Sequence, residues 1–151
     1  MRTISTVKKL SFTSKIYPVD MTIEKADFHT FCKTIRTLRS PEGCPWDRKQ
    51  TMQSLQKYIK EESDELLEAI QSNDPDHICE ESGDLLFLLV LIAEINQEAG
   101  NFSMADVIDG INKKMIGRHP HVFAGAPVGS EEELRKQWQK IKSEESLKKI
   151  N

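Results

Sequence analysis

Residues 85–93 are a run of apolar side chains, and this run limits the folds that are open to the chain. The run is too short to cross a bilayer, because a membrane-spanning helix needs about 20 apolar residues. As an α-helix it is apolar around its whole circumference, whereas a helix on the surface of a small protein needs only one apolar stripe. We therefore expect a helix that is covered on every side.

Apolar residues recur at helical spacing along most of the chain, and they predict an all-α fold. The pattern indicates a bundle of about five helices and contains no strand signal of useful length. The predicted helices span about residues 24–39, 51–72, 75–99, 104–118 and 131 onward. The segments around residues 44–47 and 119–129 are predicted to be loops.

Capping signals set the ends of these helices. Asp74, Ser103 and Ser130 are predicted N-caps, and each of the two serines has an acid three residues later, which makes a capping box. Gly100 suits the C-terminal end of the third helix, and Pro120 is expected to stop the fourth.

Four carboxylates stand as two helical pairs on either side of one predicted turn. Glu62 and Glu65 precede the turn at residues 73–76, and Glu81 and Asp84 follow it at mirrored distances. If the two helices are antiparallel, the outer pair face each other and so do the inner pair, on levels roughly 4.5 Å apart. Such a cage would repel itself unless it held a divalent cation. Carboxylate-bound Mg²⁺, or Mn²⁺ as a substitute, most often serves phosphate chemistry.

The alternative is that these carboxylates are solvated charges on exposed helix faces. The phase of the apolar residues argues against it, because Glu62 and Glu81 fall where the apolar stripes of their helices expect an apolar residue. Buried carboxylates are costly unless they are paired or metal-bound. A di-iron bundle is the main rival metal centre, but it needs Glu-x-x-His motifs, and no Glu of the chain has a His three residues later.

Five further residues are candidates for binding a nucleotide or orienting water. Lys114 and Arg118 share a helical face, where they either clamp phosphates or compensate the helix dipole. Trp46 and Trp138 either stack on a nucleobase or belong to the core. Glu61 lies about 100° around the helix from the adjacent predicted ligand. It is therefore either a water-orienting group or a solvent-facing charge.

The charge balance and the cysteine count limit the classes of binding partner and the cellular compartment that fit this chain. The 21 basic and 24 acidic residues nearly balance, so no overall field recruits nucleic acid or an anionic membrane. The 3 cysteines are an odd number and lack Cys-x-x-Cys spacing, which indicates reduced thiols in a cytoplasmic protein.

One domain is expected over residues 22–146, because a chain of 151 residues can bury a single core. Residues 1–21 are predicted to be a flexible N-terminal extension, and residues 147–151 a C-terminal tail. Residues 1–20 contain four basic residues and no acid before Asp20, so an organelle-targeting peptide is the alternative for this segment. Its single Arg and the lack of an apolar stretch favour a plain extension.

The apolar helix around residues 85–93 also predicts self-association. A chain with five helices has few partners with which to cover that helix, and the uncovered remainder would be an apolar patch of the kind that marks an interface. We expect an obligate homodimer, or a tetramer built as a dimer of dimers, with this helix at its centre.

Several sequence blocks occur together and in order between residues 25 and 146. They are Gly43-Cys44-Pro45-Trp46-Asp47, Gln50-Thr51, Ser54-Leu55, Glu61-Glu62-x-x-Glu65, Glu81-Ser82-Gly83-Asp84-Leu85-Leu86 and Arg118-His119-Pro120-His121-Val122-Phe123. With them the chain closely resembles the MazG nucleotide pyrophosphohydrolases. The resemblance implies a single-domain, all-α enzyme that uses Mg²⁺ to hydrolyse nucleoside triphosphates to monophosphates and pyrophosphate, with active sites on a dimeric helical bundle.

The resemblance also implies roles by position. The implied metal ligands are Glu62, Glu65, Glu81 and Asp84, and the implied nucleotide contacts are Lys114, Arg118 and Trp138. Ser82 replaces a Leu that is common in the family, at a position that is not a ligand.

The predicted reaction leaves two points open. The carboxylate that activates water is expected among Glu61, Glu62 and Glu65, and clearing non-standard nucleotides is one role that the enzyme could serve. Two rival functions are a non-catalytic metal- or nucleotide-binding regulator and a plain helical interaction module. The acidity of all four predicted ligands favours the enzyme.

Overall fold

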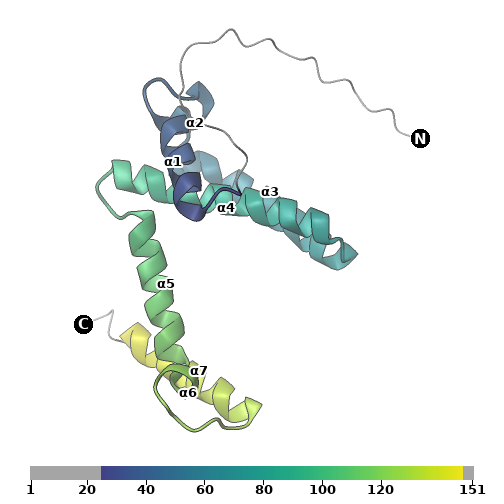
Figure 1. The fold of residues 1–151 in the computed structure, drawn as a ribbon, viewed down its shortest axis with the longest axis vertical. Helices are drawn as coiled ribbons and strands as arrows, with labels where there is room; N and C mark the ends of the chain where they lie inside the picture. The colour runs from purple at the N-terminus through teal and green to yellow at the C-terminus, as the bar shows by residue number, and fades with distance from the viewer. Residues whose placement is uncertain (1–24, 148–151) are drawn as a thin grey trace.

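The computed structural model describes residues 25–147, and its regular secondary structure in this range is helical (Figure 1). The helices are α1 (Phe28–Arg39), α2 (Pro45–Lys49), α3 (Met52–Ser72), α4 (Pro75–Glu98), α5 (Met104–Arg118), α6 (Pro120–Phe123) and α7 (Glu131–Leu147). The all-α class and the five long helices are therefore confirmed. The predicted N-terminal extension and most of the predicted C-terminal tail lie outside the described residues.

The two short helices, α2 and α6, occupy segments that the sequence predicts as loops. Each begins with a proline at its first helical position, where the fixed φ angle of proline suits a helix and its missing N–H costs nothing. Apolar periodicity cannot reveal helices of one turn, which explains the difference. Pro120 still ends α5 as predicted, because the backbone of His119 leaves the helical region with φ −121° and ψ 56°.

The predicted caps are present. The side chain of Asp74 accepts hydrogen bonds from the backbone N–H groups of Asp76 and His77 at the start of α4. Capping boxes open α5 at Ser103 and α7 at Ser130. Gly100, directly after the C-cap residue of α4, has a φ of +74°, a conformation that glycine adopts at no steric cost.

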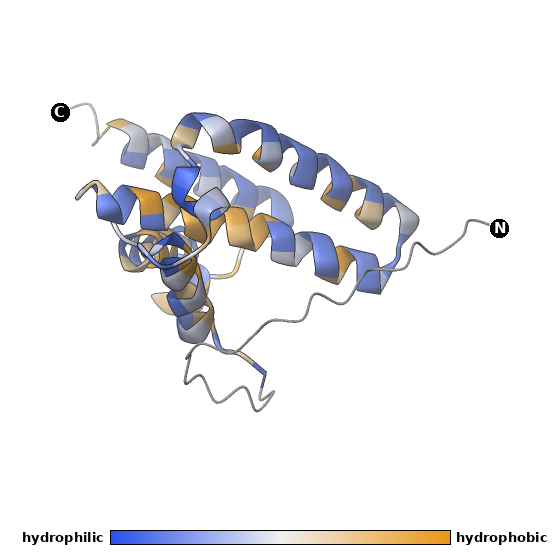
Figure 2. Cartoon of the chain, turned by 90° about the horizontal axis from the view of Figure 1, so that it is seen from above, coloured by the Kyte–Doolittle hydropathy of each residue, from blue (hydrophilic) through white to orange (hydrophobic). Residues whose placement is uncertain are grey.

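Helices α3 and α4 form an antiparallel hairpin, and α1 packs against α4. The core of this group consists of Ile35, Leu55, Leu88, Val90 and Leu91. Figure 2 shows that hydrophobic residues are concentrated in the C-terminal half of α4. None of the described helices combines the length and the hydropathy needed to cross a membrane.

Within one chain, α4 is not covered on every side. Leu86 and Leu89 remain 37% and 49% exposed, although their neighbours Leu88 and Val90 are buried. This apolar surface is the uncovered remainder that the sequence predicts for this helix.

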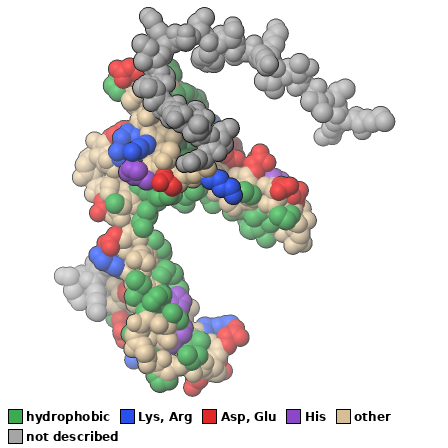
Figure 3. All heavy atoms as spheres, in the orientation of Figure 1, with side chains coloured by type: hydrophobic (Ala, Val, Ile, Leu, Met, Phe, Trp, Pro, Cys, Tyr) green, Lys and Arg blue, Asp and Glu red, His purple; other side chains and the backbone are tan. Residues whose placement is uncertain are grey.

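Helices α5, α6 and α7 form an arm that extends away from the α3–α4 hairpin (Figure 1). Helix α5 contacts α4 at one end and carries α6 and α7 at the other. Neither α5 nor α7 contains a buried residue. Figure 3 shows hydrophobic side chains along α5, where Val107, Ile108 and Ile111 are each more than 40% exposed. The arm therefore has no core of its own, and the apolar side chains of α5 remain exposed to solvent within one chain.

Arg39, the last residue of α1, joins α1 to α2 and α4. Its side chain is 8% exposed, and it donates two hydrogen bonds of 2.6 Å to the carboxylate of Glu98 at the end of α4. It donates a third, also of 2.6 Å, to the backbone carbonyl of Asp47 in α2. The guanidinium of Arg39 thus ties the end of α1 to the carboxylate of Glu98 and to the backbone carbonyl of Asp47.

We expect Arg39→Met to lower the free energy of unfolding by about 2–3 kcal/mol. The reason is that the carboxylate of Glu98 and the partly buried carbonyl of Asp47 would both lose their hydrogen-bond donor. Chemical denaturation measured by circular dichroism would show the loss. Arg135→Met is the matched control, since Arg135 is 75% exposed and pairs with an exposed glutamate. It should change stability by less than about 1 kcal/mol. Equal effects of the two substitutions would contradict the structural role of Arg39.

Candidate metal centre

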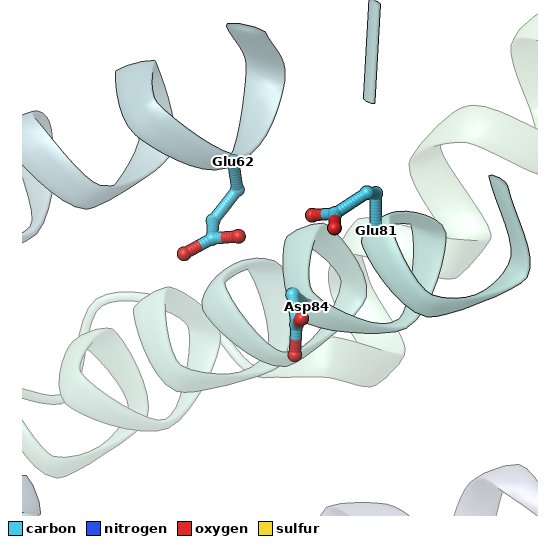
Figure 4. Close-up of side chains that lie close together, drawn as sticks. All are labelled: Glu62, Glu81 and Asp84. Carbon is cyan, nitrogen blue, oxygen red and sulfur yellow. The ribbon is translucent and has the colours of Figure 1, made fainter. Parts of the chain in front are cut away.

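Three carboxylates meet between α3 and α4. Glu62 lies in the middle of α3, and Glu81 and Asp84 lie one turn apart on α4. One oxygen from each lies within 4.8 Å of the others. Figure 4 shows Glu62 and Glu81 reaching from the two helices towards each other, with Asp84 beside them. The antiparallel pairing set by the turn at residues 73–76 therefore brings together three of the four carboxylates that the sequence selects.

Glu65, the fourth carboxylate, lies outside this group and is exposed. Three residues advance a helix by about 300°, so Glu65 is rotated by roughly 60° from Glu62 around α3. Its partner in the predicted pairing, Glu81, instead joins Glu62 and Asp84. Glu65 is nevertheless close enough for its charge to contribute to the pKa shift of Glu62. The neighbouring Glu61 is exposed on α3.

Negative charge is concentrated at this site. Burial raises the pKa of Glu62 above its ordinary value, and the charge of Asp84 raises it further, followed by those of Glu65 and Glu81. Each effect disfavours the ionised form of Glu62. A divalent cation would reverse this balance, since it attracts all of these carboxylates at once.

Glu81 is the most buried of the group. The residue is 5% exposed, and its Oε2 atom has no hydrogen-bond partner among the described residues. Its Oε1 atom lies 3.1 Å from Nε2 of His77. A buried carboxylate oxygen without a partner is expensive, and hard oxygen donors are the ligands that Mg²⁺ and Mn²⁺ prefer. The donor set and the free oxygen of Glu81 therefore fit a divalent cation.

An aromatic pair joins α2 to α3, one helical turn from Glu62. Trp46, on α2, is 46% exposed, and its ring meets that of Tyr58 edge to face at a centroid distance of 5.6 Å. Tyr58 lies one helical turn before Glu62 on α3. Lys57 places its Nζ atom 4.4 Å from the centroid of the Tyr58 ring. Tyr58 is not among the residues predicted for the site, although its i, i+4 spacing from Glu62 is a signal of proximity.

The other predicted nucleotide contacts lie on the arm. Lys114 and Arg118 are one turn apart on α5, and Trp138 is on α7. Arg118 makes an ion pair of 2.5 Å with Glu145, and its guanidinium lies 5.2 Å from the Trp138 ring. Arg118 and Trp138 line a pocket of about 310 Å³, and Lys114 is not among its lining residues. Within one chain the arm extends away from the hairpin that carries the carboxylates, so the structure does not bring these residues to them.

Comparison with known proteins connects these features to one family. Residues 50–123, which include the four predicted ligands, match the MazG nucleotide pyrophosphohydrolase domain. The chain is 48% identical over 122 residues to the nucleoside triphosphate pyrophosphohydrolase/pyrophosphatase MazG of Thermotoga maritima, covering 81% of this chain and 46% of that protein. It is 42% identical over 116 residues to the nucleoside triphosphate pyrophosphohydrolase of Escherichia coli K12, covering 76% and 44%.

A further relative is an uncharacterized protein, YabN of Bacillus subtilis, which is 50% identical over 119 residues, 79% of this chain and 24% of that protein. The chain thus spans less than half the length of these three curated relatives. A crystal structure of a MazG-related protein from Thermotoga maritima superposes with a TM-score of 0.63 at 29% identity, and the match covers 76% of this chain and 98% of that one. The shared fold, the matched domain and these relatives all lead to the same conclusion: the chain belongs to the MazG nucleotide pyrophosphohydrolase family.

Proposed function

We propose that this chain is a Mg²⁺-dependent pyrophosphohydrolase that converts nucleoside triphosphates to monophosphates and pyrophosphate. The observation that carries the proposal is the carboxylate group between α3 and α4, in which a buried oxygen of Glu81 has no partner among the described residues. The activity named for the relatives from Thermotoga maritima and Escherichia coli supports it.

In this proposal Glu62, Glu81 and Asp84 hold the cation, and Glu65 is the fourth ligand. A bound Mg²⁺ would neutralise charge on the phosphate oxygens during hydrolysis. Water attacks the α-phosphorus, and the bond from that phosphorus to the bridging oxygen breaks, so that pyrophosphate leaves. Glu61, Glu62 and Glu65 are the proposed carboxylates for orienting the water and accepting its proton.

We also propose how the rest of the nucleotide is bound. Trp46 is exposed, and it contacts a tyrosine one turn from Glu62, so it can offer a stacking surface to the base. Lys114, Arg118 and Trp138 would come from the arm of a second copy, because within one chain the arm extends away from the carboxylates.

A homodimer, or a tetramer of two dimers, would meet that need and would cover the exposed apolar side chains of α4 and α5. Neither nucleic acid nor a membrane is a proposed partner. The three free cysteines fit a cytoplasmic location.

The test is pyrophosphate release from single nucleoside triphosphates, with Mg²⁺ and with a chelator. We expect release only with the cation, and a panel that includes damaged bases would show whether non-standard nucleotides are preferred. Mg²⁺ binding without any pyrophosphate release would instead identify a regulatory nucleotide- or metal-binding module.

Metal binding should also appear in the stability of the protein. The melting temperature is expected to rise with Mg²⁺. At a Mg²⁺ concentration a hundredfold above its dissociation constant, binding should add about 2.7 kcal/mol to the free energy of unfolding. Without the cation, Asp84→Asn should melt higher than the wild type, because it removes one of the repelling charges around Glu62. Asp109→Asn is the control, since it changes an exposed carboxylate on α5. Equal melting temperatures with and without Mg²⁺ would contradict the cation site.

A further inference from the structure

We propose that His77 is a positioning residue: it holds one oxygen of Glu81 so that the other is presented to the divalent cation. The inference rests on the proposed function, because it concerns the same carboxylate site. It adds a residue that lies outside the set of acidic ligands and that the carboxylate motif does not include.

The contact between the two side chains is the first observation. His77 precedes Glu81 by four residues on α4, so both lie on the same face of the helix. Nε2 of His77 lies 3.1 Å from Oε1 of Glu81, within hydrogen-bonding distance. The Glu81 side chain is 6% exposed, whereas that of His77 is 42% exposed. The histidine therefore approaches the buried carboxylate from the solvent side.

The second observation is the state of the other oxygen. Oε2 of Glu81 is buried and has no hydrogen-bond partner among the described residues. A carboxylate with one oxygen engaged and the other free has a defined orientation and one vacant acceptor. Glu62 and Asp84 each place an oxygen within 4.8 Å of an oxygen of Glu81. A cation shared by the three residues would lie among these oxygens.

The position of His77 is itself fixed by the start of α4. Asp74 is the N-cap, and its carboxylate accepts the backbone N–H of His77 at 3.3 Å and that of Asp76 at 3.1 Å. Pro75 occupies the first helical position, where its ring restricts the backbone. A continuous series of short contacts therefore runs from the turn through His77 to Glu81.

Orientation matters here because a glutamate side chain has three rotatable bonds, and ordering them costs free energy that metal binding would otherwise have to supply. Side chains that orient a metal ligand without touching the metal typically change affinity or activity 10–100-fold when removed. We expect His77 to act on this scale, through cation affinity and not through the stability of the fold.

The experiment compares three substitutions by calorimetric titration of the full chain with Mn²⁺. His77→Leu removes the contact at similar size, and His77→Asn is too short to reach Glu81 but keeps a polar residue in the first turn. His77→Gln can place a side-chain N–H near the original Nε2 position. His29→Leu, at an exposed position on α1, is the control.

His77→Leu and His77→Asn should each weaken Mn²⁺ binding about 10–100-fold, with unchanged circular dichroism. His77→Gln should restore most of the affinity, and His29→Leu should bind as the wild type. In hydrolysis assays the two deficient variants should need more Mg²⁺ for half-maximal activity, with little change in nucleotide KM at saturating Mg²⁺.

Wild-type Mn²⁺ affinity in both His77→Leu and His77→Asn would overturn the inference, as would a lower melting temperature in both with unchanged cation affinity. Failure of the proposed function is distinguishable from either result. In that case the wild-type chain would release no pyrophosphate from any triphosphate, whatever the affinities of the His77 variants.

Discussion

Glu81→Gln is expected to reduce Mg²⁺-dependent pyrophosphate release by at least about a hundredfold, the upper end of what changes around a metal site cause without removing a ligand. The substitution keeps the size of the side chain and removes its charge. Glu81 is the most buried carboxylate of the site, and its free Oε2 is the clearest unsatisfied donor to a cation. Steady-state kinetics at saturating Mg²⁺ would measure the loss.

Glu80→Gln is the matched control for this result. It makes the same chemical change one residue earlier on α4, at an exposed position outside the carboxylate group. It should keep the activity of the wild type, while the circular dichroism of both variants should remain that of a folded helical protein. Activity retained by Glu81→Gln would remove Glu81 from the ligand set. Unfolding of that variant would indicate a structural carboxylate instead.

The contribution of Glu65 can be measured beside Glu81. The sequence places Glu65 among the ligands, whereas its side chain here lies outside the group that Glu62, Glu81 and Asp84 form. If Glu65 rotates inward when a cation binds, Glu65→Gln will weaken activity as severely as Glu81→Gln. If it stays in solvent, its loss will be closer to that of Glu80→Gln.

The parts of the structure that the sequence predicts correctly depend on local rules. An N-cap such as Asp74 or Ser103 is recognised from the few residues that follow it, and the helices begin there. The approach of Glu62 to Asp84 follows from the position of the turn at residues 73–76 and from the helical repeat of the segments before and after it. These features need no knowledge of how distant elements pack, so residue spacing is enough to predict them.

The remaining features depend on packing that spacing does not encode. The rotation of Glu65 out of the carboxylate group depends on how α3 lies against α4. The separation of Arg118 and Trp138 from the carboxylates depends on the direction in which α5 leaves α4. The contact of His77 with Glu81 has an i, i+4 signal, but that spacing acquires meaning only once the burial of Glu81 is known.

Leu89→Lys is expected to abolish the folded state at micromolar concentration or to lower its melting temperature sharply. Leu89 is 49% exposed in one chain and belongs to the most apolar part of α4. In a two-fold dimer with α4 at the interface, both copies would bury a charge where they had buried an apolar side chain, which contributes about 1.5–3 kcal/mol when fully buried. Because assembly and folding are not separable in an obligate dimer, no stable monomer should remain.

Gln97→Lys provides the control for Leu89→Lys, since it adds the same charge at an exposed polar position of the same helix. That variant should melt and assemble like the wild type. Light scattering and denaturation at several protein concentrations would compare them. A folded and active wild-type monomer of 17.3 kDa, or a Leu89→Lys variant as stable as Gln97→Lys, would contradict the dimer. Either result would also require that Arg118 and Trp138 act away from the carboxylates, because no second copy would then bring an arm to them.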